Sequence, residues 1–264
     1  CSRVLRMQPV VEISNLSKVY GSFQAVDRVG LEVHAGEIVA LLGPNGAGKT
    51  TTIKMLMGVL EPSDGSARIC GLDCFSQRAK VMAHVGFLPD EPVFYDHLRG
   101  RELLHFVGEM HGLESKTIEA RSAELCQRLG IADALEEFAV NYSKGMKKKL
   151  ALACALLSEP ELLILDEPTN GLDPFATRTL QEIIREQSEA GTAVFYSTHL
   201  LDQAEKLCTR VAIMNQGKLA AFGTLAGLQA DLSPGGSLED IFFAIASDST
   251  ETSPETSEVP EPVA

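Results

Sequence analysis

Several features that often reveal the class of a protein are scarce in this sequence. It has no tryptophan, its aromatic content is 6%, and its six cysteines are spread over 264 residues. The cysteines do not form the CxxC pairs typical of zinc sites and redox centres, so we expect reduced thiols that mostly take part in packing. A surface β-turn around Gly71 explains the closest pair, Cys70 and Cys74, better than a metal site does.

Long hydrophobic runs are also missing. The longest runs, such as residues 150–157, reach about eight residues, whereas a membrane-spanning helix needs about 20. Residues 1–9 contain Arg3 and Arg6 but lack the apolar stretch of a signal peptide. These absences predict a cytosolic chain that does not cross a membrane by itself.

Basic residues are outnumbered, because 23 Lys+Arg stand against 36 Asp+Glu and give a net charge of −13. This charge repels a phosphate backbone and argues against a nucleic-acid partner, but it says nothing about small nucleotides. The hydrophobic content of 45% is sufficient for a sizeable core, so we expect one large or two small globular domains.

The patterns along the chain predict an α/β fold. Residues 10–13 and 31–33 have short patterns typical of an antiparallel start, and three apolar runs resemble strands buried on both faces: 38–42, 162–165 and 193–196. Glycine-rich or polar residues follow each run directly. Because ligands bind at the carboxyl edge of parallel strands, we expect these residues to converge on one site.

The predicted domain organisation follows from composition and spacing. Helical spacing over about 91–157 predicts a helical insertion in the α/β core, and the folded domain is expected to cover 10–247, with C-terminal elements at about 218–247. Residues 1–9 then form an N-terminal extension. Residues 248–264 contain five acids and no Lys or Arg, which predicts a flexible acidic tail.

A glycine-rich loop follows the first buried run and matches the pattern GxxxxGK[ST] in full. Its backbone N–H groups can surround a β-phosphate, Lys49 can bridge the β and γ oxygens, and the Thr50 hydroxyl can bind Mg²⁺. We therefore predict an ATP-binding segment that comprises Gly43, Pro44, Asn45, Gly46, Ala47, Gly48, Lys49, Thr50 and Thr51.

Residues after the other two runs predict hydrolysis. Asp166 can hold Mg²⁺ through its water shell, and Glu167 can polarise the water that attacks the γ-phosphate. His199 follows the third run and can contact the γ-phosphate and maintain the geometry of that water. The predicted catalytic residues are Glu167, His199 and Lys49.

Four segments in this order resemble a known family: Gly43 to Thr50, Leu162 to Thr169, Asn170 to Asp173, and Ser197 to His199. They are similar to the nucleotide-binding subunit of ATP-binding cassette (ABC) transporters. Residues 87–92 and 237–242 are most similar to bacterial ABC-2 type exporters. The resemblance covers 10–247 and implies a P-loop NTPase (RecA-like) core with an antiparallel β subdomain and a helical insertion.

The resemblance implies further contacts with ATP. Tyr20 stands where the family has an aromatic residue that stacks on adenine. Residues 142–146 stand in the place of the signature Leu-Ser-Gly-Gly-Gln, which reaches the γ-phosphate of the ATP bound to the opposite subunit. Ser143 and Gly145 are retained from that signature.

The signature also departs from the family pattern, at Lys144 and Met146. Together with residues 147–149, Lys144 puts four positive charges near a triphosphate, which we expect to favour the closed, ATP-bound dimer. A solvated, lysine-rich helix start is the alternative for 147–149.

Asp90 stands where the family usually has a glutamine that binds Mg²⁺. Its carboxylate is shorter and charged, so it either binds Mg²⁺ strongly or repels the γ-phosphate, and Glu91 is an alternative ligand. The predicted metal ligands are thus Thr50, Asp166 and Asp90, the last with an open role. In the family, the neighbourhood of residues 94–98 accepts a coupling helix of the membrane subunit; Phe94, Tyr95 and Leu98 would be exposed there, and core packing is the alternative.

The implied function is ATP binding and hydrolysis, with ATP and Mg²⁺ as cofactors. Two such subunits, identical or different, would close around two ATPs and drive a separate transmembrane permease of an exporter. The chain would be cytoplasmic and peripheral on the cytoplasmic face of the membrane, touching it only through the permease. A soluble ABC ATPase that acts as a regulatory or assembly switch is the alternative; a module without turnover is disfavoured by Glu167 and His199.

Overall fold

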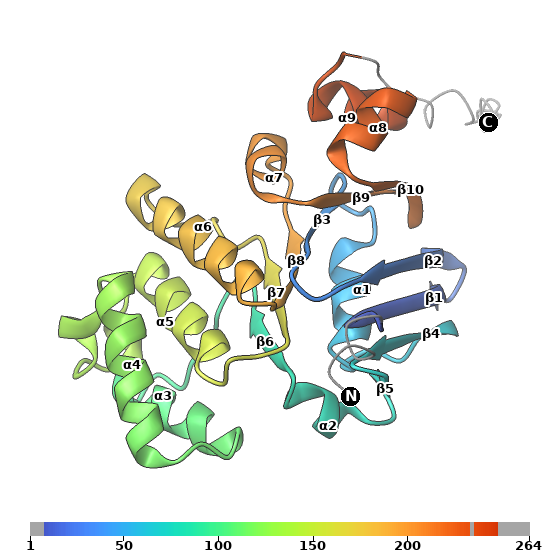
Figure 1. Cartoon of the computed structure of the whole chain (residues 1–264). Coiled ribbons are helices and arrows are strands. Elements are labelled where there is room, and N and C mark those ends of the chain that lie inside the picture. Colours follow the sequence, from blue (N-terminus) through green and yellow to red (C-terminus); the bar gives the residue numbers. More distant parts are fainter. Residues whose placement is uncertain (1–7, 233–234, 248–264) are drawn as a thin grey trace, which may run out of the picture.

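A six-stranded sheet forms the centre of the computed structural model, which describes residues 8–232 and 235–247. Figure 1 shows its strands, whose order is β10-β9-β3-β8-β7-β6. The pairs that join β6, β7, β8, β3 and β9 are parallel, and β10 adds an antiparallel edge. The bounds are β3 Ile38–Leu42, β6 Val85–Leu88, β7 Leu162–Asp166, β8 Ala193–Ser197, β9 Arg210–Asn215 and β10 Lys218–Gly223.

The three predicted buried runs are the neighbouring strands β3, β8 and β7. Every residue of β3 and β8 is buried, as expected for strands covered on both faces. The prediction that their carboxyl ends meet at one edge is confirmed.

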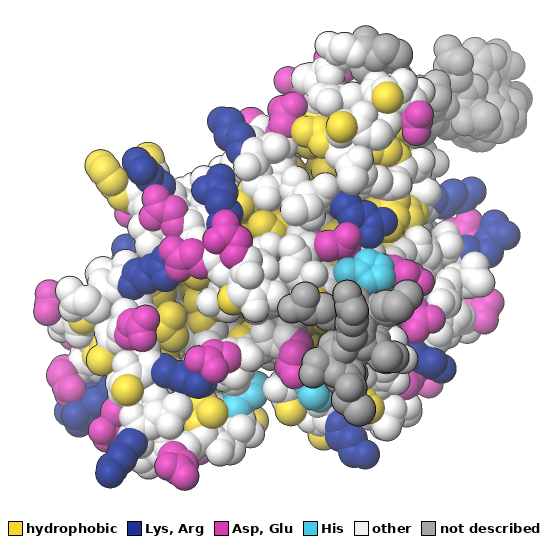
Figure 2. Space-filling view, viewed as in Figure 1, with side chains coloured by type: hydrophobic (Ala, Val, Ile, Leu, Met, Phe, Trp, Pro, Cys, Tyr) yellow, Lys and Arg dark blue, Asp and Glu magenta, His cyan; other side chains and the backbone are white. Residues whose placement is uncertain are grey.

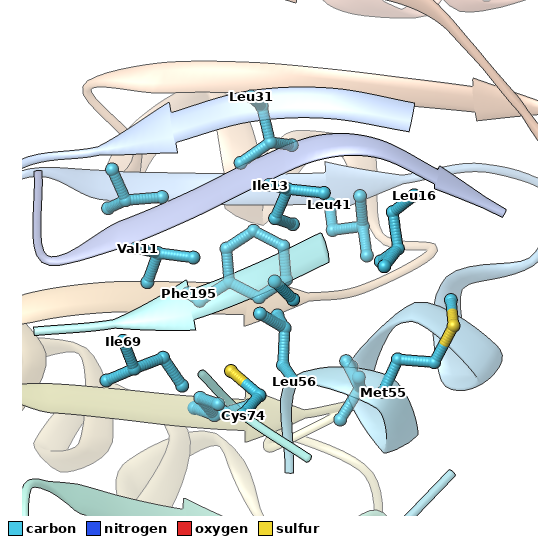
Figure 3. Close-up of a cluster of buried hydrophobic side chains, with 14 of the residues drawn as sticks. Val11, Ile13, Leu16, Leu31, Leu41, Met55, Leu56, Ile69, Cys74 and Phe195 are labelled. Atoms are coloured by element: carbon cyan, nitrogen blue, oxygen red, sulfur yellow. The ribbon is translucent and has the colours of Figure 1, made fainter. Parts of the chain in front are cut away.

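A smaller antiparallel sheet with the order β2-β1-β4-β5 lies beside the main sheet (Figure 1). Its strands are β1 Val11–Tyr20, β2 Phe23–Val33, β4 Asp64–Ile69 and β5 Leu72–Asp73. The pairing of Val11 with Val33 confirms the predicted antiparallel start. Helix α1 (Lys49–Leu56) supplies Met55 and Leu56 to the buried cluster between the sheets, which also contains Val11, Ile13, Leu31, Leu41, Ile69 and Phe195 (Figure 3).

The two neighbouring cysteines differ in environment. Cys70 and Gly71 have positive φ angles of 51° and 77° and form the exposed turn between β4 and β5, as predicted. The prediction that Cys74 also lies in a surface turn is wrong, because its side chain packs into the cluster of Figure 3 and the residue is 1% exposed. Burial raises the pKa of Cys74 to about 12. The five cysteines in the described part of the chain are free thiols.

The predicted insertion between β6 and β7 is helical (Figure 1). It contains α3 Gly100–Met110, α4 Ser115–Leu129, α5 Lys144–Leu156 and the short 3₁₀ helices Ala132–Ala134 and Ala139–Asn141. Helix α5 packs closely on β6, where a Cβ atom at Gly86 would lie 2.0 Å from the carbonyl oxygen of Ala155. Phe94 and Leu98 are half-buried against the core of this region, so core packing is correct for both; Tyr95 is exposed.

Five further helices complete the described part of the fold: α2 Arg78–Met82, α6 Pro174–Glu189, α7 Leu201–Leu207, α8 Leu225–Leu232 and α9 Leu238–Ser247. Leu238 and Ile241 of α9 are fully buried in a third cluster beneath β9 and α7. Within residues 8–232 and 235–247, no helix is long and apolar enough to cross a membrane. The predicted tail at 248–264 and most of the predicted extension at 1–9 lie outside the described residues.

Candidate functional site

A cavity of about 440 Å³ lies at the end of β3 and is lined by both sheets. It brings together most of the residues predicted from sequence to bind ATP or metal. Its lining consists of Tyr20, Phe23, Ala25, Asn45, Gly46, Ala47, Gly48, Lys49, Thr50, Thr51, Asp90, Asp166 and Glu167.

The glycine-rich loop connects β3 to α1 at the wall of the cavity. Glycine is required at Gly48, where φ is 102° and a Cβ atom would lie 2.6 Å from the carbonyl oxygen of Ala25. The loop ends at the N-terminus of α1, whose free N–H groups and dipole favour an anion. The backbone therefore has the form of a phosphate-binding cradle.

Lys49 crosses this loop. Its Nζ donates hydrogen bonds to the carbonyl oxygens of Gly43 at 2.6 Å and Pro44 at 3.2 Å. Gly43 and Pro44 do not line the cavity, and their carbonyls instead orient the lysine. Burial lowers the pKa of Lys49, while the charges of Glu167 and Asp166 oppose that shift.

Asp166 and Glu167 follow one another at the end of β7. Glu167 has a positive φ of 44°, which turns the chain at the strand end, and both residues line the cavity. Left-handed backbone at a non-glycine residue is strained and persists only where its surroundings hold it. Burial raises the pKa of Asp166, and the neighbouring Glu167 and Asp90 carboxylates add to the increase.

His199 contacts the second of these carboxylates. Its Nδ1 lies 2.9 Å from Oε2 of Glu167, and the Thr198 hydroxyl donates to the same oxygen at 3.4 Å. The Glu167 side chain is 13% exposed, whereas His199 is 53% exposed. The structure thus brings the predicted catalytic pair together at the edge of the cavity.

Asp90 reaches the cavity, but Glu91 does not. Oδ1 of Asp90 accepts a hydrogen bond from Nδ2 of Asn170 at 3.0 Å and lies 3.5 Å from Nζ of Lys148. Glu91 is exposed and faces Lys144 at 3.8 Å, so the expectation of Glu91 as an alternative metal ligand is wrong. The chain leads Glu91 away from the cavity after the end of β6.

The residues present fit Mg²⁺. Thr50, Asp90 and Asp166 offer a hydroxyl and two carboxylates to one cavity, which is a donor set for a hard cation. The described residues contain no group of three or more His, Cys, Asp or Glu that could hold a metal. Mg²⁺ keeps several waters and binds substrate phosphates, so it needs few protein ligands.

Lys148 is the clearest departure from the expected lysine cluster. Its side chain is 1% exposed, and its Nζ donates to the carbonyl oxygens of Pro89, Asp90 and Glu167. It is therefore neither a charge offered to phosphate nor part of a solvated helix start. Burial lowers the pKa of Lys148, against the charges of Asp90 and Asp166.

The signature residues lie outside this cavity. Ser143 is the N-cap of α5, where its Oγ accepts a hydrogen bond from the N–H of Met146 at 3.2 Å. Neither Ser143 nor Gly145 lines the cavity of its own chain. Their contact with the ATP of a second subunit stays a prediction.

Phe23 and Ala25 also line the cavity and were not predicted from the sequence. Phe23 is 62% exposed and Tyr20 is 48% exposed, and the turn at Gly21 places them at the same end of the β1–β2 pair. Nζ of Lys18 lies 5.4 Å from the Tyr20 ring centroid. A second aromatic residue just past a glycine turn was the available signal.

Charged side chains of both signs lie on the molecular surface. Figure 2 shows basic and acidic side chains intermixed on one face of the described part of the chain, without a continuous basic area on that face.

Comparisons with known proteins identify the family of this chain. The family model described as ABC transporter matches residues 26–170. An uncharacterized ABC transporter ATP-binding protein, YdbJ of Bacillus subtilis, is 41% identical over 221 residues, which is 83% of this chain and 71% of YdbJ. The daunorubicin/doxorubicin resistance ATP-binding protein DrrA of Streptomyces peucetius is 38% identical, over 84% of this chain and 67% of DrrA.

A solved structure of an ATP binding subunit of an ABC transporter superposes with a TM-score of 0.87 at 35% identity. The superposition covers 90% of this chain and 99% of that structure. Proteins of this kind dimerise and work with separate transmembrane permease components. The chain therefore belongs to the ABC transporter family, as an ATP-binding subunit that hydrolyses ATP to drive transport.

Proposed function

We propose that this chain is the ATPase of an exporter and that the cavity described above is its ATP site. The observation that carries the proposal is the Glu167–His199 contact at the edge of a cavity lined by the glycine-rich loop. Export is supported by two relatives whose names refer to daunorubicin/doxorubicin resistance and bacitracin transport.

ATP is held along the wall of the cavity. The N–H groups of residues 46–50 surround the β-phosphate, and Lys49 leaves the Gly43 and Pro44 carbonyls to reach the β and γ oxygens. Tyr20 and Phe23, which also line the cavity and are exposed, offer ring faces to adenine.

Thr50, Asp166 and Asp90 would hold Mg²⁺, Asp166 through water. The ion supplies charge neutralisation to the transferring phosphoryl group when it is bound. Asp166 also disfavours anions that arrive without a metal ion, because its carboxylate repels them.

Hydrolysis is assigned to Glu167. Its carboxylate accepts a proton from the water that attacks the γ-phosphate, and the Nδ1–H of His199 fixes the carboxylate orientation. The Thr198 hydroxyl supports the same oxygen at 3.4 Å. Nε2 of His199 remains available to the γ-phosphate.

A second copy or a related chain completes the site. Ser143 and Gly145 at the start of α5 would contact the γ-phosphate of ATP in the opposite subunit, since they lie outside their own cavity. The folded unit would span residues 10–247 and lie at the cytoplasmic face of the membrane, joined to it through the permease.

Glu167→Gln tests the assignment. The variant keeps the side-chain length but cannot accept the proton, so we expect ATP to bind, turnover to be lost and a dimer to accumulate with ATP in size-exclusion chromatography. Glu161→Gln is a matched control, because Glu161 is exposed and pairs with His84 away from the cavity. Turnover by Glu167→Gln at the native rate would remove Glu167 from this role.

Export itself needs a cellular test. Cells that lack the chain should accumulate the exported compound, and the native chain, but not Glu167→Gln, should restore efflux when the permease is present. Unchanged accumulation of every tested amphipathic antibiotic, with ATPase activity intact in the purified protein, would contradict the exporter role.

A further inference from the structure

Lys148 is a buried cation beside the site to which no role has been assigned. Its ammonium group donates to three main-chain carbonyl oxygens, at 3.2 Å to Pro89, 2.7 Å to Asp90 and 2.9 Å to Glu167. An ammonium group has three N–H donors, so these three acceptors satisfy it completely. Such a site is built for lysine.

The three carbonyls belong to two different loops. Pro89 and Asp90 follow β6, and Glu167 follows β7, its parallel neighbour in the sheet. Lys148 itself belongs to α5, the helix that Ser143 caps. One side chain therefore joins the loop that carries Asp90, the loop that carries Glu167 and the signature helix.

The hydrogen bond from Lys148 to the Glu167 carbonyl holds a residue whose backbone is strained. Glu167 adopts its left-handed φ of 44° at the point where the chain leaves β7. Its N–H is held by the carbonyl of Ser197 at 3.0 Å, and its own carbonyl is held by Lys148. These two hydrogen bonds hold the peptide groups on either side of the Glu167 Cα atom and so fix the direction of its carboxylate side chain.

Charge links Lys148 to Asp90 as well. Oδ1 of Asp90 lies 3.5 Å from Nζ of Lys148, and Asp166 is the other nearby anion. A buried ammonium without an anion is costly, and a carboxylate that faces a triphosphate without a cation repels it. Replacing only Lys148 or only Asp90 by an uncharged residue therefore leaves an unbalanced charge, whereas replacing both does not.

We propose that Lys148 is a positioning residue for ATP hydrolysis whose charge is matched to Asp90. It holds the backbone of Glu167 and of the Asp90 loop. Its positive charge also offsets the repulsion between the Asp90 carboxylate and the triphosphate in the ATP cavity. The inference rests on the proposed function only in that Glu167 acts at this cavity.

The experiment is a double-mutant cycle of Lys148→Gln, Asp90→Asn and the combined variant, with the exposed Lys116→Gln of α4 as control. We expect Lys148→Gln to raise KM for ATP and lower kcat, with kcat/KM reduced about tenfold or more. Adding Asp90→Asn should bring KM back to within about threefold of the native value. A merely structural role would lower the active fraction and leave KM unchanged.

A second readout does not depend on catalysis. Thermal unfolding is measured in EDTA without nucleotide. The losses in unfolding midpoint of the two single variants are added, and we expect this sum to exceed the loss of the combined variant. Because this cycle contains no ATP, it separates the charge pair from the roles proposed for Glu167.

Two results would overturn the proposal. The first is a folded Lys148→Gln with native kcat and KM. The second is strict additivity of Lys148→Gln and Asp90→Asn in both readouts. If Lys148→Gln alone does not fold, the proposal requires the combined variant to fold and hydrolyse ATP, and a combined variant that is no better folded overturns it.

Discussion

Nδ1 of His199 lies 2.9 Å from Oε2 of Glu167. An ionised carboxylate can only accept hydrogen bonds, so the proton of this contact is on Nδ1 and Nε2 points away with a free lone pair or a second proton. Because His199 is more exposed than Glu167, solvent and nucleotide can reach Nε2. The pair thus combines a fixed base with an accessible imidazole nitrogen.

Replacing His199 by Ala should lower kcat by about 10²-fold with a smaller change in KM for ATP, because Glu167 loses the donor that orients it. His199→Asn keeps a donor near the Nδ1 position and should retain more activity than His199→Ala. Steady-state ATPase assays measure both, and His34→Ala, on a histidine near Glu32, is the control. Equal activity of His199→Ala and native protein would exclude the orienting role.

Aromatic residues at the turn of the smaller sheet should hold adenine. Tyr20→Ala and Phe23→Ala should each weaken ATP binding by about tenfold, the value of one lost stacking contact. Isothermal titration of ATP measures this, with Phe106→Ala as a control at an exposed ring on α3. A loss confined to Phe23→Ala would mean that Tyr20 does not stack on adenine.

The close contact between β6 and α5 should make Gly86 intolerant of a side chain. Gly86→Ala places a Cβ 2.0 Å from the Ala155 carbonyl oxygen, and we expect the free energy of unfolding to fall by about 3 kcal/mol. Gly30→Ala in β2 is the matched control, because its Cβ would meet nothing closer than 3.5 Å. Urea denaturation compares the two, and similar values would show that α5 shifts freely on β6.

Asp173 caps helix α6, and its Oδ1 accepts a hydrogen bond from the N–H of Ala176 at 2.9 Å. This bond is the main cause of the lowered pKa of Asp173. A carboxylate with a lowered pKa stabilises the fold above its ordinary pKa of 3.8, and the contribution is lost as pH falls through the lower folded value.

Native protein should therefore be more stable than Asp173→Asn at pH 7, and the difference should vanish in acid. Asn is itself a good N-cap, so the comparison isolates the charge. Urea midpoints measure it when they are followed from pH 7 down through the ordinary pKa of 3.8 and on below it, where the difference should shrink progressively. A difference that persists unchanged at the acidic end would show that the charge of Asp173 does not contribute through this cap.

Sequence patterns predicted the parts of the site that local chemistry determines. The glycine loop, the acidic pair after β7 and His199 follow strands whose apolar runs are unmistakable, and parallel pairing places them at one edge. Phe94, Leu98 and Cys74 illustrate the limit, because exposure depends on which neighbours pack over a segment.

Lys148 could not be predicted for a related reason. A run of lysines at a helix start is normally solvated, and nothing within α5 indicates that one of them is buried. Its burial is stabilised by carbonyls 59, 58 and 19 residues away, which only the completed sheet brings together. Long-range backbone acceptors leave no local pattern in a sequence.

The helical insertion leaves the sheet from β6 and returns to it at β7, which are adjacent parallel strands. Because the pair is parallel, the chain leaves the sheet after Leu88 at the carboxyl edge and re-enters it at Leu162 at the opposite edge, so the insertion is a crossover connection. The cost of closing such a loop grows only slowly with its length. Turns of helix can therefore be gained or lost in α3 and α4 at little cost in loop closure and without altering the register of the strands on either side.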